Sequence, residues 1–355
     1  MPLVANTNLP SFERLKQEGE TIIQQDQAVH QDIRELHIGL LNMMPDAALE
    51  ATERQFFRLV GESNQIAQFY IHPFTLKELK RGPEGQVHVN QFYKTFEQIK
   101  QEGLDALIIT GANVTSPELS EQTFWQPLIE VVEWAYENVT SILCSCLATH
   151  TVLQFRYRQH RIPLPEKRWG IYSHMVTHRK HPLVTGVNTR FDVPHSRFNE
   201  ITQQQFEQAG LTILAKSEEA GVHLAVSEDG FRIVFFQGHP EYDAISLLKE
   251  YKREVGRYIN GELNEYPPFP ENYFSLQLKA ILNEYRERVI KSTEMSLAAP
   301  DFPEHLTVPV LDNTWHDSAE AVLNNWVGKV YQITHIDRNR PFAEGIDPDN
   351  PLGLP

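Results

Sequence analysis

Two cysteines lie where an apolar run meets a helical pattern, and they are the strongest candidates for covalent chemistry. Residues 141–144 have the composition of a buried strand, and apolar residues with helical spacing follow Cys146. In a sharp strand-to-helix turn the central residue is exposed and strained, so the residues two before and two after it must be small. Cys144 and Ala148 satisfy this rule around Cys146, whereas Ile142 violates it around Cys144. The spacing therefore favours Cys146 as a nucleophile.

A packing role is the alternative for both cysteines. Most free cysteines are small buried hydrophobes, and from the cysteines alone that interpretation is favoured. The predicted turn, however, places Cys146 at a helix N-terminus, where the helix dipole and free amides lower a thiol pKa and offer donors to an oxyanion.

A histidine and a glutamate follow a second apolar run. Residues 231–236 lead directly into Gln237-Gly238-His239-Pro240-Glu241, so the pair emerges at the end of a predicted strand. A cysteine, a histidine base and a carboxylate that orients the histidine form a triad. The alternative is a helix-capping Glu241 beside a solvated His239. Because both motifs end strands of one predicted sheet, we favour the triad.

These residues require a sheet that brings strand ends together. Short apolar runs alternate with helical segments, which predicts an α/β fold with a mostly parallel sheet flanked by helices. Strands are expected at 36–41, 66–71, 106–110, 141–144, 211–215, 222–226 and 231–236, and helices at 12–17, 47–60, 92–101, 119–138, 241–258, 276–293 and 318–327. We expect an N-terminal extension over 1–35, a catalytic domain over 36–262, and a C-terminal extension over 263–355 that packs on the core.

Composition limits the class of protein. The 355 residues are 41% hydrophobic and 22% charged, as in an ordinary globular protein, and no run is long enough to span a membrane. The net charge of −15 argues against a nucleic-acid or anionic-membrane partner. Two cysteines without a visible secretory signal favour a reducing, cytoplasmic location. Neither a zinc-type spacing nor a glycine-rich phosphate loop is present, so no metal or cofactor is expected.

With these motifs the chain resembles the homoserine O-succinyltransferase family, including its acetyl-transferring members. The similarity runs from Met1 to Asp337 and is carried by Asn42-Met43-Met44-Pro45, Gly111-Ala112, Cys146, Glu166-Lys167, Pro194-His195-Ser196-Arg197, Gly238 to Asp243, Arg253, Asn325-Trp326 and Val330 to Thr334. The resemblance implies a class I glutamine amidotransferase-like (flavodoxin-like) fold, a homodimer, and ping-pong acyl transfer from acyl-CoA through a thioester.

The resemblance also implies residue roles. Cys146 carries the acyl group, His239 is the acid and base, and Glu241 is its partner. The substrate-binding positions are Lys167, Ser196, Arg253, Thr115 and Asn42. A guanidinium at position 253, on the helix after the His-Pro-Glu turn, is suited to clamp an amino-acid carboxylate.

The sequence departs from the family pattern at two places. Asp46-Ala47-Ala48 follows the Asn-Met-Met-Pro motif, where the family usually carries lysines that reach the active site. Thr115 stands where family members use glycine to admit a succinyl carboxylate or glutamate to exclude it. An uncharged threonine does not repel a carboxylate, so succinyl is favoured over acetyl. Residues 277–308 are longer than expected, and no function is assigned to them.

The leading interpretation is a homoserine O-acyltransferase in methionine biosynthesis. Serine, which is one methylene shorter, is the alternative acceptor and would feed cysteine biosynthesis, since one methylene discriminates by only about 1–3 kcal/mol. A glutaminase-type amidotransferase and a non-catalytic sensor are alternatives from other classes.

Overall fold

The strands of the protein form one large sheet, and the strands that precede Cys146 and His239 are part of it. The computed structural model describes residues 3–31, 33–64, 67–114, 116 and 118–354. Within them, eleven strands form one sheet in the order β2-β1-β4-β3-β5-β6-β11-β10-β9-β7-β8. The strands are β1 (Leu3–Ala5), β2 (Ile22–Gln24), β3 (Glu35–Leu41), β4 (Gln68–Phe74), β5 (Ala106–Ile109), β6 (Ser141–Ser145), β7 (Ile162–Val176), β8 (Arg190–Glu200), β9 (Thr212–Ser217), β10 (Gly221–Val226) and β11 (Ile233–Phe236).

The sheet has a parallel part and an antiparallel part. All neighbours from β2 to β11 pair in parallel, whereas β10, β9, β7 and β8 continue the sheet with antiparallel pairs. Each strand expected from the sequence is present, and the mostly parallel α/β sheet is confirmed. The long pair β7 and β8 was not predicted. Its sequence combines prolines with charged residues, which hides the alternation of a half-exposed strand.

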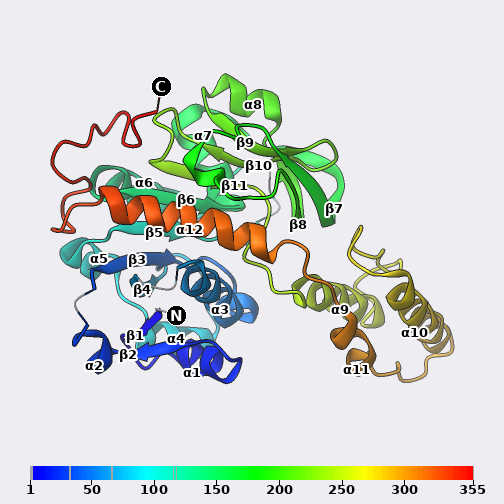
Figure 1. Cartoon of the computed structure of the whole chain (residues 1–355). Coiled ribbons are helices and arrows are strands. Elements are labelled where there is room, and N and C mark those ends of the chain that lie inside the picture. The colour runs from blue at the N-terminus through cyan, green and yellow to red at the C-terminus, as the bar shows by residue number, and fades with distance from the viewer. Residues whose placement is uncertain (1–2, 32, 65–66, 115, 117, 355) are drawn as a thin grey trace.

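Helices cover both faces of the sheet (Figure 1). Alternate residues of β5 enter different cores: Ala106 and Ile108 face α3 and α12, and Leu107 and Ile109 face α6 and α7. The helices are α1 (Pro10–Gln17), α2 (Gln25–Ala28), α3 (Asp46–Ser63), α4 (Pro83–Phe92), α5 (Phe96–Glu102), α6 (Trp125–Asn138), α7 (Leu147–Tyr157), α8 (Gln203–Gln208), α9 (Ser246–Ile259), α10 (Leu276–Glu294), α11 (Glu304–Thr307) and α12 (His316–Ile333), with 3-10 turns at Pro182–Val184 and Val308–Val310.

Three helix boundaries differ from those expected. The helix expected over 92–101 is broken, because Thr95 starts α5 with a capping box shared with Gln98. The helix expected from residue 119 begins at Trp125, and the one expected from Glu241 begins at Ser246. Glu241 therefore lies in the turn before α9 and does not cap that helix.

The terminal segments take part in the main fold. β1 and β2, within residues 1–35, extend the sheet at one edge instead of lying outside it. Within 263–355, α12 covers the sheet beside α3, while α10 packs on α9 around Tyr251 and stands apart from the sheet (Figure 1). In the described part of the chain, every helix is too short or too polar to cross a bilayer.

Candidate active site

Cys146 occupies the strained turn between β6 and α7. Its backbone φ is +50° and its ψ is −106°, a conformation that side-chain-bearing residues rarely adopt. The Cys146 N–H donates to the carbonyl of Phe236 at 2.8 Å, which ties the turn to the neighbouring strand β11. Ala148, two residues after Cys146, is buried. The structure thus has the elbow geometry that the small flanking residues predicted.

The two cysteines have different surroundings. Cys144 lies within strand β6 and is fully buried in the hydrophobic core, and burial raises the pKa of its thiol. Cys146 instead lines a cavity of about 190 Å³ at the carboxyl ends of β6 and β11. Only Cys146 can therefore meet a ligand without rearrangement of the core.

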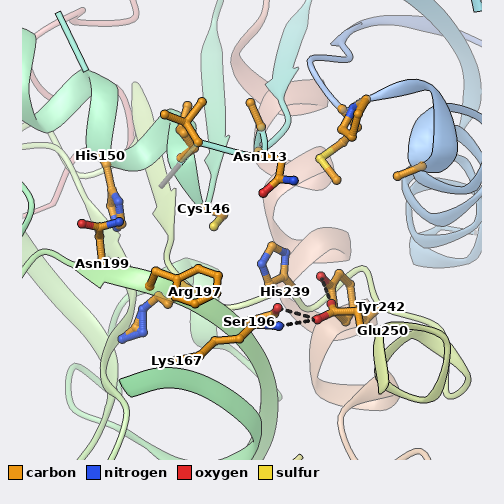
Figure 2. A pocket seen from close by; sticks show the side chains of 18 of the residues that line it. Asn113, Cys146, His150, Lys167, Ser196, Arg197, Asn199, His239, Tyr242 and Glu250 are labelled. Atoms are coloured by element: carbon orange, nitrogen blue, oxygen red, sulfur yellow. Dashed lines mark hydrogen bonds and ion pairs between the residues drawn. The ribbon is translucent and has the colours of Figure 1, made fainter. Parts of the chain in front are cut away.

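His239 faces Cys146 from the loop that follows β11 (Figure 2). Its Nδ1 donates to Glu241 Oε1 at 2.8 Å, because a carboxylate can only accept, and Nε2 is left to interact with the sulfur. Burial by itself disfavours the charged imidazole. Charge interaction and hydrogen bonding with Cys146 and Glu241 outweigh burial and raise the pKa of His239 well above its ordinary value. The imidazole is thus placed to exchange a proton with the thiol of Cys146.

A cluster of three buried histidines, His174, His195 and His223, supports the turn that carries His239. His174 Nδ1 donates to the Tyr172 carbonyl at 2.8 Å, so its Nε2 accepts from His195 Nε2 at 3.2 Å. His223 Nδ1 accepts from the Gly238 N–H at 3.3 Å, and the His239 N–H donates to the β8 backbone. Burial lowers the pKa of all three histidines, His174, His195 and His223, so they are neutral supports of the turn.

Glu250 organises the far side of the cavity. This half-buried carboxylate of α9 accepts hydrogen bonds from Lys167 Nζ at 2.9 Å, Ser196 Oγ at 2.6 Å and Tyr242 Oη at 2.9 Å (Figure 2). Burial opposes its ionisation, but the Lys167 charge and the three hydrogen bonds lower the pKa of Glu250 overall. Sequence analysis missed Glu250. It could have been found from the sequence, because it is an acidic residue next to Tyr251 within the apolar stripe of α9.

The other predicted substrate residues fall into three groups. Lys167, Ser196 and Arg253 line the cavity with Cys146, as expected. Asn42 does not: it is fully buried, and its amide bonds to the Leu49 carbonyl and the Tyr93 hydroxyl. Asn42 also accepts from the Met44 N–H at 3.2 Å, so it shapes the cavity wall from behind and does not contact a ligand. Thr115 lies outside the described residues.

The cavity is positive although the protein is negative overall. Among the described residues that line it, the cations are Arg161, Lys167, Arg197 and Arg253, and Glu250 is the acidic residue. The whole chain carries a net charge of −15. A local excess of cations can bind an anionic ligand against the field of the whole protein. No group of three or more His, Cys, Asp or Glu side chains within the described residues is arranged to hold a metal ion.

Fold and site together define an α/β protein with a Cys–His–Glu constellation at the carboxyl ends of two adjacent parallel strands. A profile of the homoserine O-succinyltransferase family matches residues 2–336. The chain is 70% identical to a homoserine O-succinyltransferase of Nitrosococcus oceani (100% of this chain, 99% of that protein) and 67% identical to one of Allochromatium vinosum, with the same coverage. One from Cardiobacterium hominis is 46% identical over 99% of both chains.

The chain belongs to the homoserine O-succinyltransferase family, and it is an enzyme of the acyltransferase class. This membership favours acyl transfer over the glutaminase and sensor alternatives. Solved structures that the chain resembles include a glutamine amidotransferase from Thermotoga maritima (12% identity, 85% of this chain and 99% of that chain, TM-score 0.40) and a glutamine amido transferase from Methylobacillus flagellatus (13% identity, 84% and 95%, TM-score 0.42).

Proposed function

We propose that the protein is a homoserine O-acyltransferase that takes its acyl group from an acyl-CoA and carries it on Cys146. The observation that supports this most strongly is the elbow cysteine next to a histidine whose other ring nitrogen is held by Glu241 at 2.8 Å. Family membership supplies the reaction class, and the names of the relatives supply homoserine as the acceptor. The product would serve amino-acid biosynthesis, in the methionine branch.

In the first half-reaction, the Cys146 thiolate attacks the thioester carbonyl of the acyl-CoA. A carbon–sulfur bond forms to Cys146, and the bond to the CoA sulfur breaks. The departing CoA thiolate takes the proton held on His239, so the imidazole becomes neutral. The N–H groups of Leu147 and Ala148, in the first turn of α7, have no acceptor inside the helix and are suited to stabilise the oxyanion.

In the second half-reaction, the homoserine hydroxyl attacks the thioester on Cys146. The neutral His239 takes the hydroxyl proton, an ester bond forms, and the Cys146 thiolate leaves beside a restored imidazolium. Arg253, which is exposed at the cavity rim, is suited to bind the homoserine carboxylate. The Glu250 carboxylate is suited to bind the ammonium group, since it is the acidic residue among the described lining residues.

A substrate matrix tests this proposal. Purified protein is mixed with acetyl-CoA or succinyl-CoA and with homoserine or serine, and free CoA thiol is followed over time. We expect rapid thiol release with homoserine and little with serine. Rapid release with serine alone would contradict the proposed acceptor, and no release with any pair would contradict acyl transfer from CoA. Cys146→Ala is the matched control, because it removes the sulfur and keeps the other side chains that line the cavity.

A further inference from the structure

Arg197 is a buried cation with unused hydrogen-bond donors in the wall of the Cys146 cavity. It lies on β8 and is 4% exposed. Its Nη2 donates to the Ala220 carbonyl at 2.6 Å, and the Glu200 carboxylate is 3.7 Å from the same nitrogen, too far for a hydrogen bond. Its Nε and Nη1 have no partner among the described residues.

A buried guanidinium with unpaired donors destabilises the protein unless a ligand accepts hydrogen bonds from those donors. Burial of a charged group with unpaired donors destabilises a protein by several kcal/mol, and an anion that accepts from those donors recovers much of this free energy. Burial lowers the pKa of Arg197 to about 10, which still leaves the guanidinium charged near neutral pH. A buried guanidinium with two unpaired donors in the wall of the cavity that Cys146 lines therefore indicates a binding subsite.

The position of Arg197 separates it from the proposed homoserine contacts. In Figure 2, Arg197 and Asn199 lie on one side of Cys146, and Tyr242 and Glu250 lie on the other. Arg161 lines the same cavity and donates to the carbonyls of Val114, at 3.0 Å, and Ser116. Arg161 and Arg197 therefore both face the cavity that Cys146 lines.

We propose that Arg197 is a specificity-determining residue that receives the terminal carboxylate of a four-carbon dicarboxylic acyl group, with Arg161 adding positive charge. The inference rests on the proposed acylation of Cys146. With carbon–carbon bonds near 1.5 Å, the second carboxylate of a succinyl thioester lies roughly 5 Å from the sulfur. An acetyl group has no carboxylate and leaves the Arg197 donors unpaired. Arg197 thus selects the donor, whereas Glu250 and Arg253 serve the acceptor.

The test compares acylation by succinyl-CoA and by acetyl-CoA in wild type, Arg197→Gln and Arg197→Lys. The rate of CoA release without acceptor gives kcat/KM for each donor. Arg197→Gln should lower the value for succinyl-CoA by about tenfold to a hundredfold, the usual contribution of a hydrogen bond to a charged group, and change that for acetyl-CoA much less. Arg197→Lys should keep part of the preference. Arg190→Gln, an exposed change on the same strand, is the matched control.

A wild-type measurement gives an answer even where a variant fails to fold. Succinate should protect Cys146 from alkylation by iodoacetamide better than acetate does at equal ionic strength. Equal protection by both anions, or an equal loss of both donors in Arg197→Gln, would overturn the assignment of Arg197 while leaving the proposed function intact. Absence of acylation by either donor in wild type would instead contradict the proposed function.

Discussion

At the scale of single residues, the proposed mechanism depends on the pairing of Glu241 with His239. Both side chains are buried, 8% exposed each, and the carboxylate holds the imidazole at 2.8 Å. A carboxylate in this position stabilises the imidazolium, and the imidazolium stabilises the thiolate.

Substitution Glu241→Gln should therefore make Cys146 less reactive near neutral pH. Without the negative charge, the pKa of His239 falls, and the fraction of thiolate–imidazolium pair falls with it. One pKa unit corresponds to about a tenfold change, and we expect iodoacetamide to alkylate Cys146 about tenfold more slowly at pH 7. Glu207→Gln, an exposed change on α8, serves as control. An unchanged alkylation rate in Glu241→Gln would show that the carboxylate only packs against the ring.

At the scale of secondary-structure elements, the turn between β11 and α9 must approach β8 closely. A Cβ added at Gly238 would lie 2.5 Å from Val193 Cγ1 and 2.9 Å from two ring atoms of His195. Such distances force either the turn or strand β8 to move. The close approach also sets the position of His239, because its N–H donates to the β8 carbonyl of Pro194 at 2.8 Å.

Substitution Gly238→Ala should lower both stability and activity. Overpacking of this kind costs about 1–3 kcal/mol, and displacement of His239 should lower kcat more than it raises KM. Gly256→Ala is a matched control inside α9, where an added Cβ meets nothing within 4 Å. It should stabilise the helix by up to about 1 kcal/mol. Chemical denaturation and steady-state kinetics measure both effects; equal behaviour of the two variants would contradict the steric argument.

The strands and helices of the parallel part of the sheet could be predicted from the sequence better than the residues of β7 and β8 that line the cavity. Cys146 and His239 could be placed because each follows a short, strongly apolar strand of the parallel sheet. Strands β7 and β8 escaped prediction, since prolines and charges interrupt their alternation. These strands carry Lys167, Ser196 and Arg197, whose proximity to the sulfur depends on long-range antiparallel pairing. Asn42 was misassigned because its motif lies near the cavity, although its side chain points into the core.

At the scale of the whole molecule, buried histidines link stability to pH. Among the described residues seven histidines are buried, and the pKa of every one except His239 lies below the ordinary value because of burial. The six are His72 (to about 2), His150 (to about 3), His174 and His181 (each to about 4), and His195 and His223 (well below the usual value). Below pH 6.5 these side chains bind protons only when the chain unfolds.

The free energy of unfolding should therefore fall as the pH drops from 6.5 towards 4. Each neutral histidine should contribute about 1.4 kcal/mol per pH unit in this window. The raised pKa of His239 has its effect above pH 6.5, where its contribution to stability is lost as the pH rises. Urea unfolding at several pH values gives the slope. His223→Gln should reduce this slope by the contribution of one histidine, about 1.4 kcal/mol per pH unit, whereas substitution of the exposed His305 by Gln should leave the slope unchanged. A flat profile would contradict the neutral state of the cluster.

The charge distribution of the whole molecule bears on the proposed use of an anionic acyl donor. Arginines and Lys167 are concentrated around Cys146, while acidic side chains prevail over the rest of the chain. The homodimer implied by the family resemblance and the cytoplasmic location inferred from the cysteine content stay predictions. So does the role of residues 277–308, although α10 packs against α9, the helix that carries Glu250 and Arg253.

The most direct test of the account is the mass of the protein after brief mixing with succinyl-CoA in the absence of acceptor. We predict a gain of one succinyl group, located by peptide mapping at Cys146 and removed when homoserine is added. Cys144→Ala should gain the same mass, whereas Cys146→Ala should gain none. A succinyl group on Cys144, or turnover by Cys146→Ala at the wild-type rate, would contradict the central claim.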